Sequence, residues 1–514
     1  MTRPSLDERS VFWGAWAALM LLATAWILGN PLMASPDEPA HTVKAASVVR
    51  GQLLGPDGAG GSEVQVPYFY NLVTAYPVCY MFDADATGVC DPEPVEELDA
   101  EAVSVTPAGR YNPLYYAIVG LPTLLPPGDG VLYAMRLISA ALCTFLLALG
   151  LRALAQAPRP AWSILGVAGA LTPMVVFLTS TVNPAAVEIA AAFALWCQLL
   201  TLLRHPDPGR TVHRMAWIAV SATFLVNARG LSLLYCAVIV AVVLLVSPWS
   251  AFVDVVRTRG AWPSLAVIGV ACVAAAGWVL GSNSLGSGGE VIDPNLTFAG
   301  AAKISVLSTN NYVVNMVGQF GWMDTFLETW VYMAFAAGAG VVTLLALAAG
   351  TWRERTALVL VAGLSLVLPI VIHASQARYL GIIWQGRYIL PVAIGLPLLA
   401  GYVLARRLGD VPRDLGVALA TVVAGVVAAV QLLAFGENLH RYVNGELGAW
   451  LSIEPDAWLP PLPLPLVVLL GLLATAGYGV LLASTARIPA PAEVADGPAE
   501  VADGEPMPVP GPMP

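Results

Sequence analysis

The apolar run VFWGAWAALMLLATAWILG at residues 11–29 is followed closely by the polar heptapeptide Ser-Pro-Asp-Glu-Pro-Ala-His at 35–41. An apolar run of roughly twenty residues matches the ~30 Å hydrocarbon core of a bilayer. The heptapeptide therefore lies where a first membrane-spanning helix leaves the bilayer. It brings two carboxylates, Asp37 and Glu38, and the imidazole of His41 to one membrane surface. The sequence predicts that the rest of the chain is a scaffold for this cluster.

The composition of the chain is that of a polytopic membrane protein. Of its 514 residues, 58% are hydrophobic and only 11% are charged, whereas soluble domains carry about 25% charged residues. The net charge of −10 comes mainly from acids in one loop and in the C-terminal tail. No basic patch indicates a nucleic-acid partner. The lipid bilayer is the partner that this composition predicts.

We predict an all-α integral membrane protein with about twelve transmembrane helices, which form one membrane domain over residues 1–485. Each apolar run is long enough, or nearly so, to cross a bilayer as a helix. A polar interruption at 227–230 splits one longer run, which predicts two short helices that meet at a turn. The expected spans are 11–29, 131–150, 161–179, 184–203, 214–227, 231–247, 262–281, 329–350, 356–374, 388–405, 415–434 and 463–484.

Arginines predict the orientation of these helices, because cytoplasmic connections are enriched in Lys and Arg. With the N-terminus in the cytoplasm, every predicted connection on that side carries at least two arginines, as at Arg152 and Arg159. Both termini are therefore predicted to be cytoplasmic. Residues 1–34 are expected to stay as an uncleaved first helix, since Leu32-Met33-Ala34 is a poor cleavage site for a signal peptidase.

The first predicted external loop, residues 30–130, is the longest stretch between spans and is rich in acids, Pro and Gly. Within it, the run 40–54 predicts an amphipathic helix that lies along the membrane interface. Residues 55–108 are expected to form an irregular loop with one or two short strands. Further external loops are predicted at 282–328 and 435–462.

Two of the six cysteines, Cys79 and Cys90, lie in this first loop, whereas the other four lie in apolar segments. Extracytoplasmic compartments are oxidising and favour disulfides. If the loop is extracytoplasmic, a disulfide between Cys79 and Cys90 is therefore predicted. No CxxC pair or Cys/His spacing indicates a zinc site.

The C-terminal residues 486–514 contain a tandem repeat, Pro-Ala-Glu-Val-Ala-Asp-Gly, at 491–497 and again at 498–504. A segment rich in proline and poor in large hydrophobic side chains cannot bury enough apolar surface to fold. We predict a disordered cytoplasmic tail that carries no chemistry.

Asp37 and Glu38 admit two interpretations. Carboxylates are favoured at helix N-termini and proline at the first helical position, so either side chain could cap a helix that Pro39 starts. Alternatively, one carboxylate is a general base that takes the proton of a hydroxyl at the membrane surface. His41 stands one helical turn after Asp37 and could share its face. On this second interpretation the catalytic group is Asp37, with Glu38 as runner-up and His41 beside it.

Several basic residues are predicted at the outer boundary of the membrane, against the positive-inside bias. An arginine there either extends to lipid headgroups or binds a phosphate through its bidentate fork. The sequence leaves both alternatives open for each arginine. Lys44 is a further basic residue that is predicted near the same surface. The four boundary arginines are Arg110, Arg229, Arg378 and Arg387.

The turn Ser-Thr-Val-Asn-Pro at 180–184 separates two predicted spans. Its simplest interpretation is structural, with Asn183 as the N-cap of the following helix. Glu188 lies about one turn further, inside an apolar helix, and an ionisable group in a membrane is a candidate functional residue. We expect Glu188 to pair either with Arg136 or with one of the boundary arginines.

The heptapeptide at 35–41 resembles the opening motif of the bacterial DUF2142 membrane proteins. Three later stretches are similar to further elements of that family and occur in the same order, so that the resemblance covers roughly residues 11–405. Each match is short, and its specificity comes from the order. These stretches are Arg-Tyr-Asn-Pro-Leu-Tyr-Tyr at 110–116, Ser-Thr-Val-Asn-Pro at 180–184 and Gln-Gly-Arg-Tyr-Ile-Leu-Pro at 385–391.

The layout of that family is similar to that of GT-C glycosyltransferases, which are polytopic enzymes that take sugars from polyprenyl-phosphate donors at the outer face of the membrane. The resemblance implies that Asp37, in the first external loop, is the catalytic base. It also implies that outer basic residues bind the donor phosphate, and Arg387, beside Tyr388 in the last motif, is the strongest candidate. The further phosphate candidates are Arg378, Arg229 and Lys44.

The same resemblance implies a GT-C-like fold in a bacterial plasma membrane and a cell-envelope glycan or glycolipid as acceptor. An inverting transfer to the acceptor hydroxyl is the implied reaction, and the loops at 42–130 and 282–328 are expected to recognise the acceptor. No cofactor is predicted. A divalent metal has no support, since arginines alone can neutralise a lipid phosphate and no carboxylate cluster requires a metal.

Two other functions are alternatives. A transporter or lipid flippase would suit twelve spans and the discontinuous helices at 214–247. Against it, the polar motifs crowd one membrane surface, and no internal repeat is evident. A non-catalytic protein of a cell-envelope assembly would keep the fold but lack a donor cavity next to Asp37.

Overall fold

The structure is a computed structural model that describes most of the chain. The described ranges are 8–90, 97–157, 159–286, 291–409, 411–450, 452–455 and 457–488. The tandem repeat and nearly all of the predicted C-terminal tail lie outside the described residues.

Nine helical segments in the described ranges are long and apolar enough to cross a membrane. Each corresponds to a predicted span, which agrees with an all-α membrane protein. Several helices are longer than predicted, so α16 and α19 extend well past the apolar runs that identify them. The segments are α1 (Glu8–Leu28), α5 (Asp129–Leu154), α8 (Pro184–Arg204), Arg259–Ser282 with α12 (Trp262–Ser282), α15 (Thr329–Ala349), α16 (Trp352–Leu380), Gly386–Arg407 with α18 (Gly395–Arg407), α19 (Arg413–Asn444) and α20 (Leu464–Ala486).

The remaining predicted spans fall on shorter or bent helices. The pairs α6 (Pro160–Ala170) with α7 (Pro173–Thr179) and α10 (Ser232–Val246) with α11 (Trp249–Arg257) bend by 70° and 116°. The described helices therefore give nine spans, or up to eleven if each bent pair is one span. Helix α9 (Thr211–Val226) is shorter still, so a count of twelve spans stays a prediction.

Proline explains the bend between α6 and α7. Pro173 has no N–H to donate, so a helix cannot continue through it without losing a hydrogen bond. The carbonyl of Leu171, at the bend, instead accepts from Nε2 of Gln431 at 3.1 Å. A side chain of α19 thus supplies a hydrogen bond at the break.

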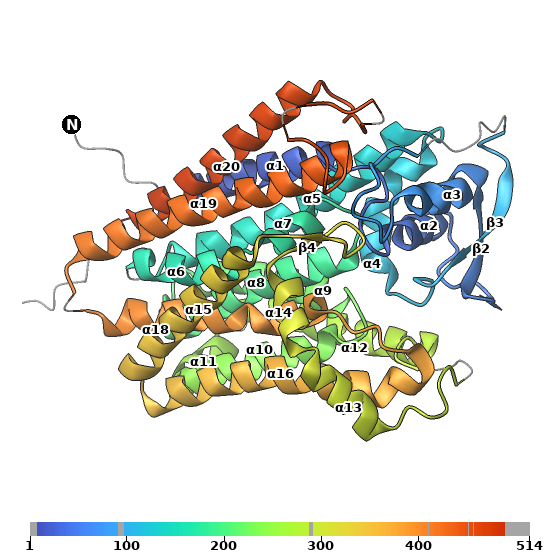
Figure 1. Cartoon of the computed structure of the whole chain (residues 1–514). Helices are drawn as coiled ribbons and strands as arrows, with labels where there is room; N and C mark the ends of the chain where they lie inside the picture. Colours follow the sequence, from blue (N-terminus) through green and yellow to red (C-terminus); the bar gives the residue numbers. More distant parts are fainter. Residues whose placement is uncertain are drawn as a thin grey trace, which may run out of the picture.

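The long helices run roughly side by side, and α8 lies among them (Figure 1). Helix α8 is almost wholly buried, because α5, α9 and α10 pack around it, whereas α12 and α15 are mostly exposed at the periphery. The elements of the first predicted loop, among them α2, α3, β2 and β3, gather at one end of the bundle (Figure 1). We call this end the loop end, and the opposite end the basic end.

The first loop is more regular than the sequence predicts. It contains α2 (Glu38–Val48), α3 (Tyr68–Leu72), η1 (Val73–Cys79), α4 (Pro113–Val119) and η2 (Leu121–Leu124). A three-stranded antiparallel sheet of order β1-β2-β3 joins β1 (Asp57–Gly58), β2 (Gly61–Pro67) and β3 (Glu101–Thr106), with Ser62 opposite Thr106 and Pro67 opposite Glu101. Burial alternates along β2, with Val64 and Val66 inside, as expected for a strand with one solvated face.

The predicted interfacial helix is shorter and more enclosed than expected. Helix α2 ends at Val48, and both its apolar Val43 and its polar Lys44 and Ser47 are fully buried. Its neighbours α4, β2, β3 and α3 cover the sides that would otherwise face water or lipid. The hydrophobic periodicity within residues 40–54 could not predict that α2 is buried, because the elements that pack on it come from later parts of the chain.

The other predicted loops also contain regular elements. Residues 282–328 contain α13 (Phe298–Leu307), α14 (Thr309–Val317) and a hairpin of β4 (Gln319–Phe320) with β5 (Thr325–Phe326). Helix α19 continues to Asn444, well into the stretch predicted as the third loop. Short elements complete the described fold, namely η3 (Arg259–Ala261), η4 (Gly386–Ile389) and α17 (Leu390–Ala393).

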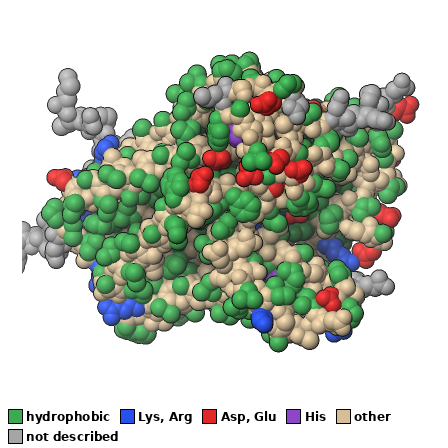
Figure 2. All heavy atoms as spheres, in the orientation of Figure 1, with side chains coloured by type: hydrophobic (Ala, Val, Ile, Leu, Met, Phe, Trp, Pro, Cys, Tyr) green, Lys and Arg blue, Asp and Glu red, His purple; other side chains and the backbone are tan. Residues whose placement is uncertain are grey.

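The two ends of the bundle differ in charge. At the basic end, arginines occupy the last turns of α5, α8 and α18, and Glu354 joins Arg204 (3.1 Å) to Arg407 (2.9 Å). Hydrophobic side chains cover much of the face drawn between the two ends (Figure 2). This separation is the one expected of a protein that crosses a bilayer.

Candidate functional site

The heptapeptide at 35–41 forms the turn that leads into α2. Asp37 has φ 67° and ψ −5°, a left-handed conformation that costs a non-glycine residue about 1–3 kcal/mol. Asp37 stands at the predicted N-cap position of α2 with Pro39 in the first turn, but its side chain makes no capping hydrogen bond. Its carboxylate is instead available for other partners.

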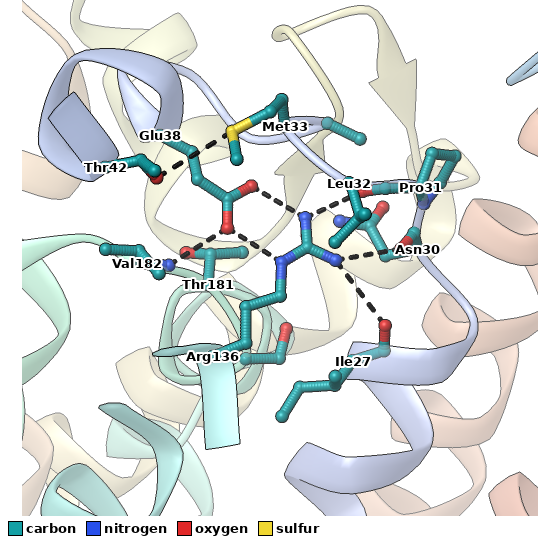
Figure 3. A network of polar contacts seen from close by, with 12 residues as sticks. Ile27, Asn30, Pro31, Leu32, Met33, Glu38, Thr42, Arg136, Thr181 and Val182 are labelled. Carbon is teal, nitrogen blue, oxygen red and sulfur yellow. Dashed lines mark hydrogen bonds and ion pairs between the residues drawn. The ribbon is translucent and has the colours of Figure 1, made fainter. Parts of the chain in front are cut away.

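Glu38 forms a buried ion pair with Arg136 of α5 (Figure 3). Two hydrogen bonds of 2.7 Å join Nε and Nη2 of Arg136 to the two carboxylate oxygens. Oε1 of Glu38 also accepts from the backbone N–H of Val182 at 3.1 Å, and Arg136 donates to the carbonyls of Asn30 (2.9 Å) and Pro31 (2.7 Å). Both side chains are at most 1% exposed. This geometry gives Glu38 a structural role and favours Asp37 as the reactive carboxylate.

Asp37 binds Arg387, which lies in the last sequence motif. Nη2 of Arg387 donates to Oδ2 of Asp37 at 2.8 Å, and the Asp37 side chain is 50% exposed whereas Arg387 is only 4% exposed. A buried guanidinium therefore orients a carboxylate that a ligand can still reach. The guanidinium carbon of Arg387 also lies 5.4 Å from the centre of the Tyr388 ring.

Asn183 contributes to the position of this turn. Its Oδ1 accepts from the backbone N–H of Ala185 at 2.9 Å, which is the predicted N-cap of α8. Its Nδ2 donates to the carbonyl of Pro36 at 3.4 Å. The turn before α8 and the turn before α2 are therefore held against each other beside Asp37.

Glu188 and Arg229 form a second acid–base pair nearby. Their closest nitrogen and oxygen lie 3.6 Å apart, and Oε1 of Glu188 accepts from Oγ of Ser232 at 2.5 Å. The partner of Glu188 is thus a boundary arginine, and Arg136, the other candidate, is bound to Glu38 instead. The guanidinium carbon of Arg229 lies 4.6 Å from the ring centre of Tyr388 and 5.8 Å from that of Tyr111.

A cavity of about 300 Å³ opens beside Arg229. The ends of several helices meet around it, since the end of α9, the start of α10, the end of α12 and the last turns of α16 all contribute. Glu188, Arg229 and Tyr388 lie in its wall together with aromatic and aliphatic side chains. Because Arg229 and Arg387 both approach the ring of Tyr388, the cavity and Asp37 are neighbours.

Three predicted basic residues lie apart from Asp37. Lys44 is buried, and its Nζ donates to the carbonyls of Leu53 and Gly109, both at 2.6 Å; burial lowers the pKa of this amine to about 8. Arg110 pairs with the exposed Asp57 at 2.9 Å, although it borders the cavity. Arg378 is exposed in the last turn of α16. Of the predicted phosphate ligands, Arg387 binds Asp37 directly, and Arg229 lies against the same Tyr388 ring as Arg387.

His41 is buried and interacts with Tyr116. Nδ1 of His41 and the hydroxyl of Tyr116 lie 2.8 Å apart, so the imidazole is directed to a side chain of α4. Burial lowers the pKa of His41 to about 3, and the charges of Arg229 and Arg387 contribute to the shift although Asp37 opposes it. The imidazole is therefore neutral at neutral pH and supports the turn through this hydrogen bond.

Acidification is expected to destabilise the protein through His41. In an unfolded chain a histidine has a pKa near 6.5, so below that pH the unfolded state binds a proton that the folded state does not. From pH 8 to pH 5, His41 alone should lower the free energy of unfolding by about 2 kcal/mol. Thermal unfolding in detergent at both pH values should show that His41→Asn loses less stability on acidification than the wild type.

The matched control is His213→Asn, because His213 is exposed at the basic end. Burial and the charge of Arg152 also lower the pKa of His213, though this side chain is exposed. This control should therefore keep more of the wild-type pH dependence than His41→Asn does. Equal losses of stability in the wild type and His41→Asn would contradict the prediction.

Some residues that organise the site carried little signal in the sequence. Arg136 looked like a partner for Glu188, because nothing local links it to Glu38. Tyr111 and Tyr116 belong to the motif at 110–116, but no spacing or charge pattern in that motif indicates their role beside His41. Arg441 also escaped notice: it pairs with Asp324 at 3.1 Å and donates to three carbonyls of the first loop, those of Tyr80, Asp83 and Ala86.

A disulfide joins Cys79 to Cys90 in the first loop. The carbonyls that Arg441 binds lie within this closed segment, so the disulfide closes the segment and Arg441 attaches it to α19. Within the described ranges, no group of three or more His, Cys, Asp or Glu side chains is placed to hold a metal ion.

Comparisons with known proteins give one match. A family model described as "Predicted membrane protein (DUF2142)" matches residues 20–396. No curated protein and no solved structure matches the chain. The matched range runs from within α1 to α18, so it includes the turn at Asp37 and the Arg387 segment.

Proposed function

The chain belongs to the DUF2142 family of predicted membrane proteins, and from this premise and the geometry around Asp37 we propose that it is an inverting glycosyltransferase of GT-C type. It would move a sugar from a polyprenyl-phosphate donor to a cell-envelope glycan or glycolipid. The observation that carries the proposal is the half-exposed Asp37 carboxylate, which a buried Arg387 orients next to a cavity that contains a second arginine.

The proposed reaction is a single displacement. Asp37 accepts the proton of the acceptor hydroxyl while the hydroxyl oxygen bonds to the anomeric carbon. The bond between that carbon and the donor phosphate oxygen breaks, its electron pair leaves with the phosphate, and the anomeric configuration inverts. Arg387 and Arg229 bind the phosphate, because guanidinium groups match phosphate oxygens in charge and geometry.

The location of the site supports an enzyme more than a transporter. Transporter sites lie near the middle of the membrane at broken helices, whereas this cavity lies where several helices end, beside residues 107 and 110–112 of the first loop. The Asp37 side chain is also 50% exposed in the turn before α2, an element of the loop end, where an acceptor outside the bilayer would arrive. The arginine-rich basic end supports cytoplasmic termini in a bacterial plasma membrane, with the loop end outside.

The experiment is reconstitution of the purified protein in liposomes with a panel of radiolabelled polyprenyl-phosphate sugars and an envelope extract as acceptor. We expect the label to be transferred to the extract. Heat-treated protein, the control, should transfer none. In parallel, deletion of the gene should remove one sugar from the envelope glycans. If no donor is consumed and the glycans of the deletion strain are unchanged, the transferase proposal fails.

A further inference from the structure

Four polar atoms in the wall of the cavity lack hydrogen-bond partners among the residues that the structure describes. Each is buried, and each belongs to a residue that lines the cavity. An unsatisfied buried polar group costs about 1–3 kcal/mol, and native proteins contain few of them. The four atoms are Glu188 Oε2, Tyr235 Oη, Ser284 Oγ and Trp384 Nε1. Glu188 Oε2 makes no hydrogen bond but lies 3.6 Å from Nη1 of Arg229, so its charge is paired.

The chemistry of these atoms is that of a site for hydroxyl groups. The ionised carboxylate of Glu188 only accepts hydrogen bonds, the indole of Trp384 only donates, and the hydroxyls of Tyr235 and Ser284 do both. A phosphate group only accepts hydrogen bonds, so it cannot satisfy the Glu188 carboxylate. Sugar hydroxyls both donate and accept, so they are complementary to each of these four kinds of atom.

The rest of the wall suits a sugar attached to a lipid. Trp278, Trp384 and Tyr388 present aromatic side chains, while Ala275, Val279 and Ile372 form an apolar side on α12 and α16. Helix α12 is mostly exposed at the periphery of the bundle, so a hydrocarbon chain could leave the cavity on that side. The volume of about 300 Å³ lies at the small end of ligand pockets, which favours a single sugar unit.

We propose that this cavity binds the sugar of the lipid-linked donor through Glu188, Tyr235, Ser284 and Trp384 and thereby selects which sugar is transferred. The proposal rests on the proposed transferase function and adds the position of the sugar. Arg229, in the same wall, would hold the phosphate next to it, and the shared contact of Arg229 and Arg387 with Tyr388 connects that phosphate to Asp37.

The test uses two variants that each remove one hydroxyl, Tyr235→Phe and Ser284→Ala. Binding to the full-length protein in nanodiscs is measured for farnesyl phosphate esters of glucose, mannose, galactose and N-acetylglucosamine, and for farnesyl phosphate without a sugar. Each variant should bind the preferred ester about 2- to 12-fold more weakly, the effect of one hydrogen bond. Affinity for farnesyl phosphate should not change.

The matched control is Tyr478→Phe, because the Tyr478 hydroxyl is also buried without a partner but lies in α20 and does not line the cavity. It should bind both compounds as the wild type does. If both cavity variants bind the ester normally, or lose the same affinity for farnesyl phosphate, the cavity does not bind the sugar, whatever the reconstituted protein transfers. If the wild type binds no ester better than farnesyl phosphate and transfers no sugar, the transferase function itself fails.

Discussion

Replacing Asp37 by asparagine is expected to lower the rate of sugar transfer by about 10²- to 10⁴-fold, the usual contribution of a general base. Asparagine has nearly the same shape and still offers an oxygen to Arg387 at the position of Oδ2, so the turn should persist. The loss should therefore appear in kcat far more than in donor affinity. Initial rates in liposomes at several donor concentrations, with the amount of inserted protein measured in parallel, give both quantities.

Asp57→Asn is the matched control for Asp37→Asn. Asp57 also belongs to the first loop and also pairs with an arginine, Arg110, but its side chain is 73% exposed and does not line the cavity. This variant should transfer sugar at nearly the wild-type rate. If Asp37→Asn is as active as Asp57→Asn while the deletion strain still lacks the sugar, the protein acts without this base.

Replacing Arg136 by methionine is expected to destabilise the protein by about 3–5 kcal/mol, because it leaves Glu38 as an unpaired buried charge. Total unfolding free energies are about 5–15 kcal/mol, so much of the protein should be unfolded or lost during purification. The carbonyls of Asn30 and Pro31 would lose their donor in the same variant. Size-exclusion profiles and thermal unfolding in detergent measure the effect.

Two further variants separate charge burial from loss of the arginine side chain. Arg110→Met breaks an exposed ion pair, which contributes only about 0–1 kcal/mol, and should behave like the wild type. The double variant Glu38→Leu with Arg136→Met removes both charges and should recover part of the stability. If Arg136→Met and Arg110→Met are equally stable, the buried pair of Glu38 and Arg136 contributes nothing to the free energy of unfolding.

That the chain is a helical membrane protein, and where most of its long helices lie, could be predicted because both depend on local composition. A run of about twenty apolar residues forms a spanning helix wherever it occurs, and the polar interruption at 227–230 breaks a helix without help from other segments. The heptapeptide at 35–41 and the motif at 385–391 were both singled out by their residues. Their contact, across 350 positions of sequence, was expected only through the resemblance.

The first loop could not be predicted in the same way. Its sheet pairs β2 with a strand almost forty residues later, and α2 is buried because distant segments cover it. Helices α13 and α14 lie in a stretch, 282–328, for which the sequence predicts an external loop and no helix. In each case non-local packing outweighs the local signal, which is weak in short amphipathic segments.

What the sequence determined by itself is a polytopic helical protein with a pair of carboxylates at one membrane surface, because hydrophobic length and residue type suffice for both. Which carboxylate is buried and which stays open was decided by the tertiary structure. Arg136 in α5 pairs with Glu38 and the left-handed turn directs Asp37 toward Arg387. Adjacent residues with the same chemistry differ in this way because burying a charge requires a partner in space, and the chain brings such partners from segments that no local pattern connects.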